Sequence, residues 1–283
     1  MRFFKFKLFK NQRKVNTPRK ERRTTLIHIT KRQKFIITVL ILSFAFFFSE
    51  RIFGQSGIVF SIALTLLTEL FFLWALLRDI DETKSYQVFV LPFFYSLSFG
   101  LFYFLTPHRF ITNIVVALLF AVGMYSLLLS QNIFIVASVR TIALLTGARI
   151  VSFVLTLISF FFLINVVFSL HFSAIPTSMI TFLITIFLLY HTLWTYTLEK
   201  SLTSQLIWVS VLSLGIFEIS LLLWFWPSTP TVIALFLTGL FYIVAGLSHV
   251  WLDRRLFRNV LWEYVWVGLV IFIIFIFSTQ WRA

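Results

Sequence analysis

The chain alternates between long apolar runs and short polar segments from residue 33 to its end. The apolar runs are about 20 residues long, which is the length an α-helix needs to cross the hydrocarbon core of a bilayer. Uniformly apolar runs of this length are typical of spanning helices, which satisfy all their backbone hydrogen bonds internally. The sequence therefore predicts an all-α, polytopic membrane helix bundle with about nine spans, at 33–51, 58–77, 86–105, 110–130, 150–170, 176–198, 206–226, 231–252 and 261–281.

The composition supports lipid as the solvent for most of the chain. Hydrophobic residues make up 60% of it and charged residues 12%, whereas soluble domains hold about 45–50% and about 25%. The chain has no cysteine, which excludes disulfides, thiolate catalysis and cysteine-ligated metal sites. We predict no metal site and no cofactor.

The first 34 residues differ from the rest because they carry thirteen Lys and Arg against one acid. We expect residues 1–34 to be a basic, largely mobile cytoplasmic arm, and residues 35–283 to be a single transmembrane domain. The segment MRFFKFKLFK mixes basic and apolar side chains, as in segments that lie on anionic headgroups. The expected partner of the arm is thus the lipid bilayer, through Arg2, Lys5, Lys7 and Lys10.

The remaining basic residues indicate orientation. With the arm inside the cell, the cytoplasmic segments hold 21 Lys and Arg and the outer segments hold three, as the positive-inside rule requires for an N-terminus inside and a C-terminus outside. The nine Trp lie near predicted span ends, which is typical of interfacial aromatic belts. The net charge of +14 therefore reflects orientation, and we expect no nucleic-acid partner. The expected location is the cytoplasmic membrane of a bacterium.

One segment, residues 131–149, is apolar but is not assigned a span. Arg140 would lie near the centre of such a span, at a cost of roughly 2.5–3.5 kcal/mol or more. We expect a partly helical cytoplasmic connector at the membrane interface, with Gln131, Ser138 and Arg149 on one polar face.

Three ionisable residues interrupt the apolar runs: Glu69, Glu218 and His191. Ionisable groups within a membrane usually face the bundle interior and often mark a transport pathway. The first functional hypothesis is a small transporter or permease-like protein in which Glu69 and Glu218 line a proton- or ion-coupled site, with His191 as a possible relay. The structural alternative is that each group only hydrogen-bonds to a neighbouring helix, a role also expected for Asn165.

Two further functions stay open. The chain is either a non-catalytic membrane scaffold or complex subunit, or a membrane-embedded enzyme acting on a lipid-linked substrate. Candidate enzyme groups are the acidic loop 79–82 and an outer edge with Ser56, His108 and His171. GQSGIVF, at 54–60, resembles the GxSG motif of rhomboid intramembrane proteases, but the cytoplasmic position expected of His249 separates it from Ser56. We expect the protein not to be an enzyme.

Small residues suggest where helices approach closely. Gly239 and Gly246 are seven residues apart and therefore share one helix face. We predict a packing seam there, in the centre of the bundle, because small residues allow close contact between membrane helices. The last span, rich in Ile, Phe and Val, is expected to face lipid.

Overall fold

The computed structural model describes residues 30–53, 57–83, 86–105, 110–139, 143–198, 203–254 and 257–279, with side chains except at 49–53, 77–83 and 203–204. All regular secondary structure in these residues is helical, which confirms the predicted all-α fold. The elements are α1 (Lys31–Phe53), α2 (Gly57–Thr83), the short 3₁₀ helix η1 (Tyr86–Phe89), α3 (Val90–Leu105), α4 (Phe110–Ala137), α5 (Leu145–Ser169), α6 (Ala174–Thr197), α7 (Thr203–Trp224), α8 (Pro230–Leu252) and α9 (Arg258–Ser278).

Eight segments, within α2 to α9, are long and apolar enough to cross a membrane. The protein is therefore a multi-pass membrane protein. Helix α1 has 23 residues and packs against α2 and α4, but its apolar run is bounded by Lys34 and Glu50. Its crossing of the membrane stays a prediction. Residues 31–34, assigned to the arm, form the first turn of α1; the rest of the arm, including Arg2, Lys5, Lys7 and Lys10, lies outside the described residues.

The interfacial connector predicted at 131–149 is wrong. Helix α4 continues to Ala137, and Gln131, Phe134 and Ile135 are buried in its last two turns. Helix α5 already begins at Leu145. The stretch is therefore the end of one helix, a short turn and the start of the next, and its polar residues do not form one interfacial face.

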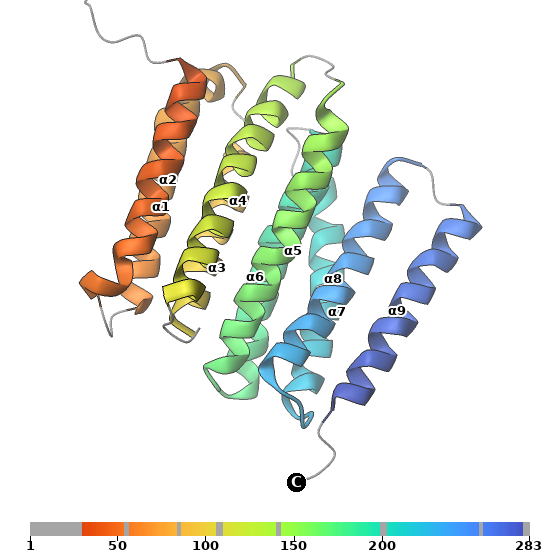
Figure 1. The fold of residues 1–283 in the computed structure, drawn as a ribbon. Coiled ribbons are helices and arrows are strands. Elements are labelled where there is room, and N and C mark those ends of the chain that lie inside the picture. Colours follow the sequence, from red (N-terminus) through yellow and green to blue (C-terminus); the bar gives the residue numbers. More distant parts are fainter. Residues whose placement is uncertain are drawn as a thin grey trace, which may run out of the picture. The chain divides into compact units, whose positions relative to one another are not determined.

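The helices pack in two rows (Figure 1). One row contains α1, α4, α5, α8 and α9, and the other contains α2, α3, α6 and α7. After α1, the chain thus places two consecutive helices in one row and the next two in the other. Helix α9 packs on α8 at the end of its row, and only Phe275 of its side chains is buried. The last span is thus exposed, as expected of a helix that faces lipid, and its contact with lipid stays a prediction.

The core between the rows is aromatic and contains many hydroxyl side chains. Phe46, Phe120 and Tyr95 are among its fully buried rings. Buried Thr65, Thr181 and other hydroxyls donate to the carbonyl four residues earlier in their own helix. Such local hydrogen bonds satisfy a hydroxyl without a partner from another helix, so these groups do not mark a polar pathway.

Specific contacts between α5, α8 and α9 test two predictions. The Nδ2 atom of Asn165 donates to the Thr231 hydroxyl at 3.0 Å, joining α5 to α8 as expected. A Cβ at Gly239 or Gly246 would lie 2.6 Å from Ile271 or Tyr264. The predicted seam of small residues therefore exists, but it is not in the centre of the bundle. It packs against α9 at the end of the row, where α8 is the helix with which α9 makes extensive contact.

Candidate functional site

The three predicted site residues lie on different helices and are not brought together. Glu69 is on α2, which packs against α1, α3 and α4. Glu218 is on α7, which packs against α6 and α8, and His191 is on α6. The two carboxylates thus belong to opposite ends of the same row of helices (Figure 1). They do not face a common site in this structure.

Glu69 is partly buried within α2. Its Oε1 atom is buried and has no hydrogen-bond partner among the described residues. The neighbouring hydroxyl of Thr68 donates to the Leu64 carbonyl and is not available to it. This oxygen thus makes no hydrogen bond to another helix, which was the structural role predicted for Glu69.

Glu218 has the opposite environment, because its side chain is exposed on the surface of α7. The exposed residues before and after it on that face are apolar, among them Leu214 at 48% and Leu222 at 70% exposure. A carboxylate therefore stands in a face that would otherwise contact lipid.

His191 is fully buried and both of its ring nitrogens have a partner. Nδ1 lies 3.1 Å from the Gln87 carbonyl and Nε2 lies 3.5 Å from the Ser152 hydroxyl. The Trp194 ring packs 5.9 Å away, centroid to centroid. These contacts join α6 to η1 and α5. They agree with the alternative that His191 only hydrogen-bonds to neighbouring helices. Trp194 itself is only 2% exposed, so it is a core residue and not part of an interfacial belt.

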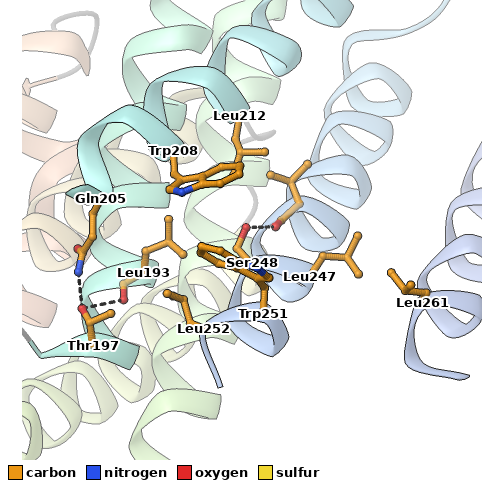
Figure 2. A pocket seen from close by; sticks show the side chains of 11 residues that line it. Leu193, Thr197, Gln205, Trp208, Leu212, Leu247, Ser248, Trp251, Leu252 and Leu261 are labelled. Atoms are coloured by element: carbon orange, nitrogen blue, oxygen red, sulfur yellow. Dashed lines mark hydrogen bonds between the residues drawn. The ribbon is translucent and has the colours of Figure 1, made fainter. Parts of the chain in front are cut away.

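A cavity of about 520 Å³ lies elsewhere, among α6, α7, α8 and α9. Its depth along the bundle is about 12 Å, from the eight-residue separation of Val244 and Leu252 on α8 at 1.5 Å per residue. Figure 2 shows the side chains of α6, α7 and α8 around it, with Leu261 of α9 apart on its far side. Its lining is mostly apolar: Leu193, Thr197, Gln205, Trp208, Leu212, Val244, Leu247, Ser248, Trp251, Leu252 and Leu261.

Three polar side chains occupy the cavity near the α6–α7 and α8–α9 connections, at the predicted cytoplasmic end. The Nε2 atom of Gln205 donates to the Thr197 hydroxyl at 2.6 Å, and Gln205 is only 8% exposed. The Ser248 hydroxyl donates to the Val244 carbonyl at 2.6 Å (Figure 2). A hydrogen-bonded polar pair, Gln205 and Thr197, thus lines one part of the cavity.

The side of the cavity is open. The Trp208 and Trp251 rings, from α7 and α8, lie 5.2 Å apart and are about half exposed, at 52% and 50%. Leu261 is 39% exposed. Tryptophan prefers the membrane interface, where one part of its ring is apolar and its N–H is wet. The side of the cavity that these three side chains form is therefore partly exposed.

Sequence reasoning did not find this cavity. Its lining residues come from four helices, and each is unremarkable within its own apolar run. Only Trp208 and Trp251 could be recognised from the sequence, because both lie at the same end of neighbouring spans, as interfacial residues do. Arg254 and Arg258, both exposed, flank the α8–α9 connection next to Leu252 and Leu261. Asp253 is also exposed there, and residues 253–258 together hold three Arg and one Asp, so the net charge next to this end of the cavity is positive.

A second polar group, on α5, α6 and α8, is held by structural contacts. The guanidinium of Arg149 donates to the carbonyls of Thr195 and Tyr196 at 3.0 and 2.8 Å, and so caps the end of α6. The Tyr196 ring stacks on His249 with centroids 3.9 Å apart. The Nε2 atom of His249 is buried and has no partner among the described residues. No nucleophile lies within hydrogen-bond distance of it in this part of the chain.

The groups proposed for an enzyme are mostly outside the described residues. Ser56 and His108 are not described, and neither are the side chains of 79–82. His171 is exposed, and its Nδ1 lies 2.7 Å from the Ser169 carbonyl. Among the described residues, no three His, Asp or Glu side chains are grouped so that they could hold a metal ion.

Comparison with known proteins identifies a family but no activity. The chain has no match among curated proteins or among solved structures. Residues 37–278 match the family model described as "Protein of unknown function (DUF5656)", from within α1 to the end of α9. This range covers the helical bundle except the first six residues of α1, and it includes the cavity; the chain therefore belongs to the DUF5656 family.

Proposed function

We propose that this membrane protein binds a lipid-class amphiphile in the cavity among α6, α7, α8 and α9. The observation that carries the proposal is a mostly apolar cavity of about 520 Å³, with a hydrogen-bonded polar pair in its lining and two half-exposed tryptophan side chains at its side. Ligand pockets typically enclose about 300–1,000 Å³ and are mostly apolar with a few polar groups that fix orientation.

The lining suggests how such a molecule would lie. Its acyl chain would pack along Leu212, Val244 and Leu247, which form the deeper, apolar part. Its polar group would lie near Gln205, at the end that Arg254 and Arg258 border. Because lipid headgroups collect cationic side chains at the interface, an anionic headgroup fits this end better than a neutral one.

Coupled transport, the first hypothesis from the sequence, has less support from the geometry. A coupled site needs groups that respond to the same ion, and Glu69 and Glu218 lie on helices that do not pack together. His191 is held by Gln87 and Ser152. Transport through these residues stays a prediction, whereas lipid binding uses a cavity that the described residues form.

Photo-crosslinking tests the proposal. The full chain is placed in nanodiscs that contain an anionic phospholipid with a diazirine on its acyl chain, and the adducts are mapped by mass spectrometry. We expect adducts to concentrate on α7 and α8 residues of the cavity. A matched zwitterionic photolipid should label them less.

Two serine variants make the result specific. Ser248→Phe puts a ring into the cavity, and overpacking of about 1–3 kcal/mol would weaken binding by roughly 5- to 150-fold. Ser210→Phe adds the same ring on the exposed surface of α7 and should leave labelling unchanged. Equal labelling of wild type and Ser248→Phe, with both folded by thermal unfolding, would refute the proposal.

A further inference from the structure

Helix α7 and the residue that follows it carry a continuous exposed face, defined here by Ile207, Val211, Leu214, Glu218, Leu222 and Phe225. These residues recur every three or four positions and therefore share one side of the helix. The five apolar members are 48–71% exposed, and Glu218 is exposed among them. The cavity residues Trp208 and Leu212 lie on a different side of α7, so this face is independent of the proposed lipid site.

The position of Glu218 makes this face unfavourable in lipid alone. Glu218 is six residues before Trp224 at the end of α7, which places it about 9 Å inside the helix end. Its carboxylate has no hydrogen bond or ion pair within the described part of the chain. An acid at this depth is expensive unless another group satisfies it, and its short side chain cannot reach headgroups past Leu222 and Phe225.

The surface next to Glu218 suits another helix. Gly215 lies one turn before Glu218, and nothing lies within 4 Å of the position that a Cβ would take there. Small residues on an exposed helix surface allow a second backbone to approach closely, which lets a side chain of that helix hydrogen-bond to the first. The apolar members on either side provide the packing surface.

The charge of Glu218 favours another protein over a second copy of this chain as the partner at this face. A second copy related by a two-fold axis along the membrane normal would bring two Glu218 carboxylates together at one depth, and like charges disfavour each other. The chain cannot offer a cation instead, because no Lys or Arg lies in the interior of a predicted span. We propose that the Glu218 face docks a transmembrane helix of another protein that carries a Lys or Arg at the depth of Glu218.

Designed peptides provide a defined partner. One is a Leu/Ala transmembrane helix with a single Arg at the depth of Glu218; a second has Leu at that position. Association with the full chain, labelled at a cysteine introduced by Ala283→Cys, is followed by energy transfer in liposomes. We expect the Arg peptide to bind and the Leu peptide to bind roughly 3- to 20-fold more weakly, the range of polar pairs between membrane helices.

Acid-to-leucine variants at two sites complete the test. Glu218→Leu should bind both peptides equally, whereas Glu69→Leu should retain the preference for Arg. Glu218→Gln should retain part of it, because an amide still accepts a hydrogen bond. Equal binding of the two peptides by wild type would overturn the proposal. So would an efficient disulfide dimer of the Val211→Cys variant that forms without added peptide, because it would assign the face to a second copy.

Discussion

Polar side chains within this bundle fall into three groups according to their hydrogen-bond partners. Most hydroxyls use a carbonyl of their own helix, as Thr65 and Thr181 do. Asn165 and His191 use another element. Glu69 and Glu218 have no protein partner among the described residues, although a polar group without a partner is costly in lipid.

The Asn165–Thr231 contact is a measurable link between α5 and α8. We expect Asn165→Leu and Thr231→Val each to lower stability, and the double variant to lose less than their sum. The coupling energy should be about 0.6 kcal/mol, and at most about 1.7, as in other membrane helices. Unfolding of the four proteins in mixed micelles measures it, and strictly additive losses would contradict the contact.

Gly246 should be sensitive to a single methyl group. Gly246→Ala would place its Cβ 2.6 Å from the Tyr264 ring, and overpacking costs about 1–3 kcal/mol. Gly147, near the start of α5, has nothing within 4 Å of that position. Gly147→Ala should therefore gain up to about 1 kcal/mol from reduced backbone entropy. Thermal unfolding should move in opposite directions for the two variants; a stabilised Gly246→Ala would show that α9 does not pack as described.

At the scale of the helices, hydropathy predicted the positions of the helices along the chain well. It did not predict which face of a helix is buried and which is exposed. The spans predicted at 86–105 and 231–252 match the described helices to within a residue, because apolar length is what a bilayer selects. Residues 131–137 were missed because the whole segment 131–149 was denied a span on account of Arg140, whereas α4 ends at Ala137 and buries Gln131. The side on which Glu218 lies could not be predicted, because residues all around such a helix are apolar.

Arg149 is expected to stabilise the end of α6. Its guanidinium holds the carbonyls of Thr195 and Tyr196 and lies 4.6 Å from the Tyr196 ring centroid. Hydrogen bonds to charged groups contribute about 1.5–3 kcal/mol, so Arg149→Leu should lower stability by about 2 kcal/mol. Arg149→Lys should recover only part, because an ammonium lacks the planar fork of donors.

A matched arginine provides the control for that measurement. Arg258→Leu removes an exposed side chain at the start of α9, and should change the free energy of unfolding by no more than about 0.5 kcal/mol. Hydrogen exchange should show faster opening at the end of α6 in Arg149→Leu alone. Equal effects of the two leucine variants would mean that net charge, and not the cap, is responsible.

At the scale of the whole bundle, the row pattern explains why the cavity forms at its end. After α1, the chain places two consecutive helices in each row in turn, and ends with α8 and α9 in one row. A further helix in this pattern would lie in the other row, next to α7. The cavity among α6, α7, α8 and α9 thus lies where the bundle has no further described helix to cover α7 and α8. No sequence repeat indicates this pattern, because any apolar surface can pack into it.

The topology of the chain follows from whether α1 crosses the membrane. With nine crossings the two termini lie on opposite sides, and Figure 1 shows α1 beginning and α9 ending at opposite ends of the bundle. With eight they lie on the same side. With nine crossings, the distribution of Lys and Arg, 21 inside and three outside, places the α8–α9 connection inside. With eight crossings and that connection inside, the thirteen of the arm would lie outside, and the count would be eight inside and 16 outside. Because the chain has no cysteine, an impermeant maleimide can test this in intact cells: Ser228→Cys should react and Arg254→Cys should not. If a tag before Met1 is detected only after the cells are opened, the chain crosses the membrane nine times. If the tag is detected on intact cells while the cysteines react as expected, α1 lies on the outer surface and the chain crosses eight times.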